Sequence, residues 1–433
     1  MSEFDRIVLR NGANDREFAG VRDELSQKLA QDYGYPVTQH CTPAAVFLNG
    51  EYYGYSWVHE NYNEDYLATY FGGNKDNYEI VSNIEDADEG SERALEDYGK
   101  LYAYYDRDLT DDSTAVMDFA AALLRQTTKE EGVLLSPVSL LYALGMTANG
   151  AAGTTLSQLE QATGMDRDTL NDYLYTYRMS LPENTKKCKL SLANSLWVRD
   201  IFRVEDSFLD NCVSYYDAEV YRSAFDEAMK NDLNHWVSKQ TDGMIDKLLE
   251  QAPDQRTMLY LVNAVCFDAK WKKPYEKENI QKGVVFTAAD GTRQTADLLW
   301  SQESLYLSDD NTTGFMKYYD GGRYAFVGLL PNEGVSIADY VAGLTGGKLH
   351  ALLNDPQHGT VEAAIPRFKA SSSLELSDAL KAMGVTDAFD SAAADLRAMG
   401  GAPNDQLYVS AVLHKTYLEL DENGTKAAAV TAV

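Results

Sequence analysis

The segment Glu419-Leu-Asp-Glu-Asn-Gly-Thr-Lys-Ala-Ala-Ala-Val-Thr-Ala-Val433 joins an alternating apolar run to a tail of small side chains. Across residues 407–420 the apolar side chains fall mostly at every second position, which predicts a strand with one buried face. Residues 421–424 have turn chemistry and predict a reversal of the chain. The small side chains of residues 425–433 could enter a sheet that opens to receive them, although three consecutive alanines also suit a frayed, functionless tail.

Composition limits the classes of partner. The chain has 433 residues, of which 45% are hydrophobic and 11% aromatic, so we expect packed cores and roughly two or three domains. A net charge of −29 disfavours nucleic acids and anionic membranes as partners. No apolar run suits a membrane span, and the first residues lack the pattern of a signal peptide. The four cysteines lie far apart without the spacing of a zinc site, so we expect neither a metal nor a cofactor.

Residues 1–115 are rich in Tyr, Asn, Asp and Gly. They predict a strand at Ile7-Val-Leu9, a helix over residues 21–33 and a hairpin with Asn49-Gly50 at its turn, followed by an acidic loop from Asp86. The motifs Leu9-Arg-Asn-Gly-Ala-Asn-Asp15 and Phe47-Leu-Asn-Gly-Glu-Tyr-Tyr-Gly54 resemble the spore-coat CotH-type kinase domain of bacteria. The resemblance covers a middle slice of that domain, without its phosphate-covering and metal-binding parts. It therefore implies an incomplete α+β segment that does not catalyse phosphoryl transfer.

The composition changes near residues 111–115, where we place the boundary between a segment 1–115 and a domain 116–433. Ser113 or Thr114 can cap a helix that buries Phe119 and Leu123 and ends near residues 130–132. A second helix should begin at Ser136-Pro137, and its apolar sequence predicts that it lies deep in a core.

Motifs across residues 116–433 resemble the serpin family in order and spacing. They are Leu135-Ser-Pro-Val-Ser139, Gly150-Ala-Ala-Gly-Thr154, Asn194-Ser-Leu-Trp197, Asn234-His-Trp-Val-Ser-Lys-Gln-Thr-Asp-Gly-Met-Ile245, Leu261-Val-Asn-Ala-Val-Cys-Phe-Asp-Ala-Lys-Trp271 and Ile365-Pro-Arg-Phe368. This resemblance implies an α+β fold in which helices pack on a large, mostly antiparallel sheet A, with smaller sheets B and C.

The resemblance also assigns functional residues. The hinge is identified with Glu422, Gly424, Thr425, Lys426, Ala427, Ala428 and Ala429, with Lys426 in place of the usual acid. The shutter, a polar cluster beneath the point where the sheet parts, is identified with Ser136, Ser139, Asn263 and His414, and the breach at the top of the sheet with Trp271. In the family, cleavage of the loop beyond the hinge lets the hinge insert as a strand and trap the acylated protease, an example of strand addition. Neither serine has triad partners at a recognisable spacing, so we expect no catalytic residue and no enzymatic activity.

The family pattern places the scissile bond beyond Val433, so we expect a serpin domain that lacks its C-terminal strands, either a cleaved inhibitor or an incomplete gene product. The sequence predicts a monomeric serine-protease inhibitor that acts outside the cell or at its surface, with a protease of unknown specificity as its partner. Two alternatives remain: a non-inhibitory serpin-fold binding or surface module, and a CotH-type protein kinase remnant.

Overall fold

A computed structural model describes residues 110–128, 132–288, 291–401 and 406–433, together with Ala68 and the backbone of five strands before residue 90. The chain divides into two compact units, Met1–Arg107 and Asp108–Val433.

The described part of the first unit consists of short strands. β1 (Ile7–Arg10), β2 (Cys41–Leu48) and β3 (Glu51–Glu60) form an antiparallel sheet in the order β1-β3-β2. The predicted hairpin is confirmed, because Leu48 pairs with Glu51 and leaves Asn49-Gly50 between the strands. The prediction of an acidic loop is wrong for its first residues. Asp86–Glu89 form strand β5, because the apolar strand β4 (Ile80–Ser82) pairs with them. The helix predicted at residues 21–33 lies outside the described residues.

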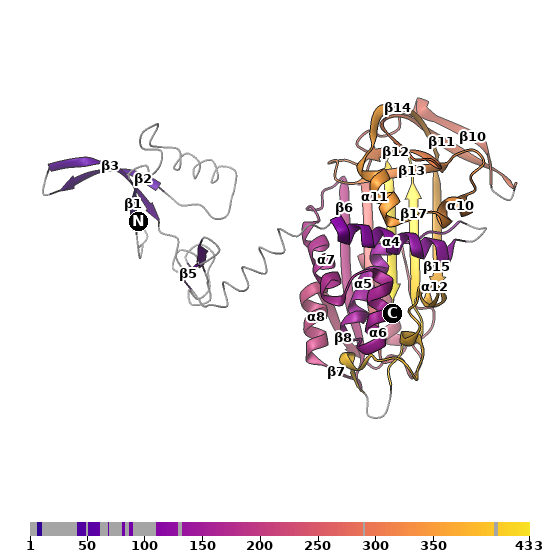
Figure 1. The fold of residues 1–433 in the computed structure, drawn as a ribbon, viewed down its shortest axis with the longest axis horizontal. Coiled ribbons are helices and arrows are strands. Elements are labelled where there is room, and N and C mark those ends of the chain that lie inside the picture. Colours follow the sequence, from indigo (N-terminus) through magenta and orange to yellow (C-terminus); the bar gives the residue numbers. More distant parts are fainter. Residues whose placement is uncertain are drawn as a thin grey trace. The chain divides into compact units, whose positions relative to one another are not determined.

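A six-stranded sheet forms the centre of the second unit (Figure 1). Its strands, in spatial order, are β15 (Phe368–Glu375), β17 (Leu413–Leu420), β18 (Gly424–Ala432), β9 (Leu259–Lys270), β6 (Cys188–Arg199) and β8 (Ala218–Ser223). All neighbours are antiparallel except β6 and β8, which are parallel. The C-terminal strand β18 therefore lies inside this sheet, between β17 and β9.

Helices cover one face of this sheet, and Figure 1 shows several of them in front of the strands. These are α4 (Thr110–Thr127), α5 (Pro137–Asn149), α6 (Gly153–Thr163), α7 (Arg167–Ser180), α8 (Asp206–Tyr216) and α12 (Ser377–Ala382), and they share one apolar core with the sheet. As predicted, Ser136 caps α5 and Pro137 begins it, and α5 is buried from Ser139 to its end. The helix expected from residue 113 begins at Thr110 and ends at Thr127, and it buries Phe119 and Leu123.

On the opposite face α9 (Glu227–Gln240) packs over the sheet and forms a second core with it. Leu233 and Val237 of α9 are fully buried there and share this core with Val430 of β18. The central strands are thus enclosed on both faces.

A second sheet joins the two smaller sheets that the sequence predicted, because one long strand runs through both. Its members are β10 (Ile280–Thr287), β11 (Arg293–Ser308), β12 (Thr312–Tyr318), β13 (Ala325–Pro331) and β14 (Gln357–Pro366). β11 pairs with β10, β12 and β14 along its 16 residues. The remaining described elements are α10 (Ile337–Ala342), α11 (Gly346–Asn354), three short 3₁₀ turns (Lys277–Asn279, Asp387–Phe389, Arg397–Met399) and the β7–β16 pair (Arg203–Val204 with Gly400–Gly401).

One strand is shorter than its sequence pattern predicts. The alternation from residue 407 suggested a single strand, but β17 begins at Leu413. Residues 406–412 instead contact other segments: the Val409 amide donates to the Ala388 carbonyl, and the Val412 amide donates to the Glu375 carboxylate. Val409 and Val412 are nevertheless buried in the core of the α5 face. Val412 does not belong to the predicted apolar face, and Ala411 and Leu413, which do, are only half-buried. The alternation therefore predicted the burial of Val409 but neither the strand nor the buried face of this segment.

Candidate functional site

β18 is the candidate functional element, and its side chains are small because both of its faces are covered. Thr431 faces α5, where its hydroxyl contacts that of Ser139 at 2.9 Å. Ala428, Val430 and Ala432 face α9 and belong to its core. Ala428 is 4% exposed and Val430 is fully buried. Longer side chains here would have to displace a helix, since protein cores are close-packed.

The predicted hinge residues occupy the turn before β18 and its first half. The Glu422 carboxylate pairs with the Arg367 guanidinium at 2.5 Å. A Cβ on Gly424 would lie 2.1 Å from the carbonyl oxygen of Ala269, so the close approach of β9 requires glycine at this position. The structure thus gives both residues a local role at the point where the chain turns into the sheet.

Beyond Gly424 the hinge residues pair with strands on both sides. The Thr425 hydroxyl is buried and accepts a hydrogen bond from the Tyr319 hydroxyl at 2.7 Å. Lys426 lies on the same face as Ala428 but is exposed to solvent. Ala427, Ala428 and Ala429 each pair with β17 and with β9.

Trp271, the predicted breach residue, holds the turn that precedes β18. Its indole Nε1–H donates to the Asp421 carbonyl and its backbone N–H to the Asn423 carbonyl, both at 2.9 Å. The indole is 2% exposed and stacks on Tyr319 with ring centroids 4.5 Å apart. Tyr319 is the same residue that donates to Thr425, so one aromatic pair fixes both the turn and the beginning of the strand.

A buried lysine, which the sequence analysis did not single out, lies beside this aromatic pair. Lys317 is 4% exposed, and its ammonium lies 2.6 Å from the Glu303 carboxylate. It also lies 4.5 Å from the Tyr275 ring centroid and 5.7 Å from that of Trp271. A buried charge of this kind requires a partner, and the carboxylate and the ring faces provide it. The alternation in Phe315-Met-Lys317 was the available signal, since Lys317 shares the face of a buried phenylalanine.

Three of the four predicted shutter residues meet in one hydrogen-bonded cluster with Thr431. The Ser136 amide donates to His414 Nε2 at 3.1 Å, and His414 Nδ1 lies 2.8 Å from the Thr431 hydroxyl. Burial lowers the pKa of His414 to about 4, so the ring is neutral at pH 7. Because Nε2 accepts, Nδ1 carries the proton and donates to Thr431 Oγ1, which leaves the threonine hydroxyl to donate to Ser139. Ser139 and His414 are fully buried, so neither can meet a substrate.

The fourth predicted residue, Asn263, does not join this cluster. It is the cross-strand partner of Thr431, but its amide donates to Asn194 of β6 at 2.9 Å. Asn194 in turn donates to the Tyr216 carbonyl at 2.7 Å. The buried Asn263 Oδ1 has no hydrogen-bond partner among the described residues. The sequence analysis did not identify Thr431 or Asn194, although Thr431 lies an even number of residues after Thr425 and therefore on the same face.

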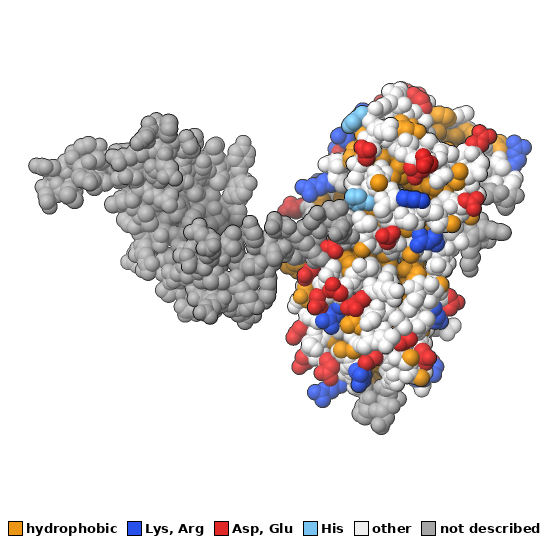
Figure 2. All heavy atoms as spheres, in the orientation of Figure 1, with side chains coloured by type: hydrophobic (Ala, Val, Ile, Leu, Met, Phe, Trp, Pro, Cys, Tyr) orange, Lys and Arg blue, Asp and Glu red, His pale blue; other side chains and the backbone are white. Residues whose placement is uncertain are grey.

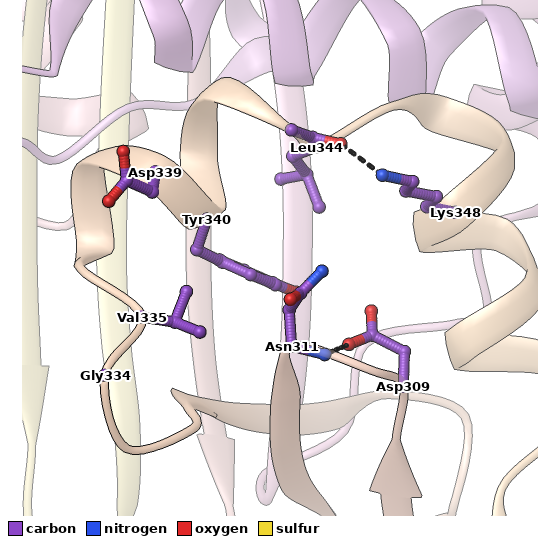
Figure 3. Close-up of a pocket in the computed structure, with 9 residues that line it drawn as sticks. Asp309, Asn311, Gly334, Val335, Asp339, Tyr340, Leu344 and Lys348 are labelled. Carbon is purple, nitrogen blue, oxygen red and sulfur yellow. Dashed lines mark hydrogen bonds between the residues drawn. The ribbon is translucent and has the colours of Figure 1, made fainter.

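The cavities in the described part of the second unit include two of different size. One, of about 620 Å³, adjoins the end of β18 and is lined by residues that include Leu259, Leu407 and Val433. The other, of about 230 Å³, lies between the turn after β11 and helix α10 (Figure 3). There the Tyr340 ring extends toward Asn311, and the Lys348 ammonium is already bound to the Gly343 carbonyl at 2.7 Å. The smaller cavity is separate from β18.

Within the described residues, no group of three or more His, Cys, Asp or Glu side chains is arranged to hold a metal ion. No described helix combines the length and the apolar character that crossing a membrane requires. On the face seen in Figure 2, acidic and basic side chains are interspersed rather than gathered into a patch of one sign.

Comparison with known proteins identifies the class to which this fold belongs. The family model described as serpin (serine protease inhibitor) matches residues 114–433, and the model described as CotH kinase protein matches residues 1–134. Human Serpin B9 is 31% identical over 335 residues, which is 74% of this chain and 88% of the relative. Neuroserpin of Gallus gallus is 29% identical over 326 residues, 72% of this chain and 78% of the relative.

Among solved structures, the thermophilic serpin tengpin in its latent state matches with a TM-score of 0.72 and 40% identity, over 76% of this chain and 90% of that one. The chain therefore belongs to the serpin family, and its N-terminal part is similar to CotH kinase proteins. Both resemblances predicted from the sequence are confirmed.

Proposed function

We propose that this serpin inhibits a serine protease by inserting Gly424–Ala432 into the central sheet after its reactive loop is cleaved. The observation that carries the proposal is the position of β18, which pairs with β9 along its whole length and with β17 from Thr425 to Ala432. A strand added in the middle of a sheet gains backbone hydrogen bonds on both edges and buries its side chains on both faces. Insertion is therefore strongly downhill, as an irreversible trap requires.

The chemistry begins in the protease. Its serine oxygen attacks the carbonyl carbon of the scissile peptide bond, the C–N bond breaks, and the departing amine takes a proton from the protease histidine. The protease remains attached through an ester to the residue before the broken bond. The freed segment then enters the sheet before water hydrolyses this ester, and the attached protease is displaced and distorted.

The cluster around His414 supports insertion in a specific way. The segment brings the Thr431 hydroxyl beneath the sheet, where it accepts from His414 and lies 2.9 Å from Ser139. Insertion therefore supplies an acceptor to a buried imidazole N–H that would otherwise need another partner. At the other end of the strand, the Tyr319 hydroxyl finds its acceptor in Thr425.

We infer that the chain is not an enzyme and that its partner is a protease outside the cell or at its surface. A net charge of −29 opposes binding to nucleic acids and to anionic membranes. We further propose that the inhibitor is a monomer, which combines with one protease.

The test uses the protein with its reactive loop intact, mixed with trypsin-like, chymotrypsin-like and elastase-like proteases. We expect a covalent complex that survives boiling in SDS, together with a higher unfolding temperature of the cleaved protein. A Thr425→Arg variant should be cleaved without forming the complex, because an arginine cannot occupy this buried position. A Thr287→Arg variant adds the same charge at an exposed site and should inhibit normally.

Cleavage without a complex would contradict the proposal and favour a non-inhibitory serpin-fold module. Absence of both cleavage and complex with all three proteases would also count against inhibition. Transfer of phosphate from ATP and Mg²⁺ to a protein substrate would instead support the kinase alternative.

A further inference from the structure

A row of side chains with alternating charges crosses the central sheet near the beginning of β18, and Lys426 is the central member of the row. The register makes Lys369 the partner of Glu419, Glu419 the partner of Lys426, Lys426 the partner of Asp268, and Asp268 the partner of Lys189. Five neighbouring strands thus each contribute one charged side chain, and the sign of the charge alternates from one strand to the next, beginning and ending with a lysine. We call these five residues the charge row.

The members of the charge row lie on one face of the sheet. Residues directly opposite each other on paired strands project to the same side, with Cβ atoms roughly 5 Å apart. Lys426 is two residues from Ala428, so both lie on the α9 face, and Lys426 is exposed beyond the end of that helical cover. The outer members are held by ion pairs: Lys369 lies 2.7 Å from Glu419, and Lys189 lies 2.6 Å from Asp242, a residue that follows α9.

The positive charge of Lys426 helps to lower the pKa values of two carboxylates near it, those of Glu419 and Asp242. The pKa of Glu419 is lowered first by its hydrogen bond with Lys369, then by that with Tyr417, and also by the charge of Lys426. The pKa of Asp242 is lowered chiefly by Lys189, with a further contribution from Lys426. The ammonium of the inserted strand therefore adds attraction to carboxylates that already have partners on the neighbouring strands.

Without β18, Glu419 and Asp268 would be like charges on the two strands that border the open position. A lysine arriving between them replaces this repulsion with two attractions. The usual acid of the family at the position of Lys426 would instead add a third carboxylate to the row. The lysine and the two acids that flank it are thus matched.

The charge row also distinguishes the correct register from its neighbours. A shift of one residue would turn the Lys426 side chain to the α5 face, because successive side chains in a strand alternate. A shift of two residues further into the sheet would place it where Ala428 lies, between Tyr417 and Cys266 beneath α9. Both positions would bury an ammonium with no carboxylate opposite, which is strongly unfavourable.

We propose that Lys426 is a positioning residue whose attraction to Glu419 and Asp268 draws the hinge into the sheet and fixes its register. This inference rests on the proposed function for its biological meaning. Its physical content, the coupling of Lys426 to the two flanking carboxylates, can be measured in the chain without any protease.

The experiment measures hydrogen–deuterium exchange of the β18 amides in the full chain by mass spectrometry. Lys426→Glu should speed their exchange roughly tenfold in low salt, since two attractive cross-strand pairs become repulsive. Lys426→Gln should have a smaller effect in the same direction. At 1 M NaCl, where charges are screened beyond about 3 Å, the difference should largely disappear.

Two controls separate positioning from a general charge effect. Lys282→Glu makes the same change in net charge at an exposed site on β10 and should leave β18 exchange unchanged. In a background carrying Glu419→Gln and Asp268→Asn, the effect of Lys426→Glu on exchange should be largely lost, because neither of its cross-strand neighbours is then a carboxylate. If Lys426→Glu does not yield folded protein, Lys426→Gln measured in both backgrounds gives the same comparison.

The proposal is overturned if Lys426→Glu resembles Lys282→Glu, or if its effect is equal in the two backgrounds. Failure of the proposed function gives a different result. The wild-type protein would then form no SDS-stable complex, while β18 exchange would still depend on Lys426, Glu419 and Asp268 as described.

Discussion

At the scale of single residues, His414 shows how burial and two hydrogen bonds define the role of a side chain. The ring accepts from the Ser136 amide and donates to Thr431, so both of its nitrogens are satisfied only when the ring is neutral. A protonated ring would have a donor at Nε2 facing the donor of Ser136. The cluster is therefore sensitive to acid, and the strand that depends on it should be too.

The first prediction concerns this sensitivity. The pKa of His414 falls from 6.5 in an unfolded chain to about 4 in the folded protein because of burial. Between these values the unfolded state binds more protons, so the free energy of unfolding decreases as pH falls from 6.5 toward 4. The contribution amounts to about 3 kcal/mol at most.

Urea unfolding at pH 7 and pH 4.5 checks this prediction. The loss of stability on acidification should be smaller in His414→Gln than in the wild type. His358→Gln removes an exposed histidine and should retain the wild-type loss. Identical losses in all three proteins would mean that other groups account for the acid sensitivity.

At the scale of elements, α9 and β18 stabilise each other. The apolar face of α9 lies on Ala428, Val430 and Ala432, which the alternation of β18 places on one side. The helix therefore covers the region of the sheet that the C-terminal strand occupies. A substitution that weakens the packing of α9 should therefore also weaken the attachment of β18 to the sheet.

The corresponding prediction uses Leu233, which is fully buried at the centre of this contact. Leu233→Ala should lower the free energy of unfolding by about 2–5 kcal/mol, since it leaves a cavity. It should also accelerate amide exchange across β18. Leu330→Ala, at a residue that is 71% exposed, should change neither quantity appreciably. Faster exchange confined to α9 would show that the helix and the strand are not coupled.

At the scale of the whole molecule, the chain consists of two compact units with a boundary near residue 107. All three apolar cores found among the described residues lie within Asp108–Val433. The CotH match extends to residue 134 and so overlaps the beginning of the serpin match at residue 114. Most of helix α4 (Thr110–Thr127) lies within this overlap, and the helix packs into the serpin core through Phe119 and Leu123.

We predict that a fragment comprising Asp108–Val433 folds by itself. Differential scanning calorimetry should give the same unfolding midpoint for the fragment as for the corresponding transition of the full chain. A fragment that begins at residue 128, and therefore lacks α4, should be markedly less stable. An insoluble or much less stable 108–433 fragment would show that the preceding residues contribute to the serpin core.

The sequence predicted local features well where their causes are local. Ser136-Pro137 begins a helix because of capping and proline geometry, and Asn49-Gly50 gives a hairpin because of its turn preference. It predicted less well where distant segments decide the outcome. Residues 407–412 have strand-like alternation, but the segments beside them supply other hydrogen-bond partners.

The candidate site shows the same limit. The family resemblance identified His414 and Ser139, but not Thr431, whose role depends on a strand register that composition does not specify. It grouped Asn263 with them, whereas the structure pairs its side chain with Asn194. Lys426 appeared as a departure from the family pattern, and only the pairing of β18 with both neighbours showed the carboxylates beside it.

The two hydrogen bonds from Trp271 to the turn before β18 fix the point from which the length of this strand is measured. With Asp421 and Asn423 held at one end of the sheet, the nine residues of β18 extend away from a fixed point. At roughly 3.4 Å per residue, the strand spans about 30 Å. During the proposed insertion, any group attached to the far end of β18 would therefore move by a comparable distance.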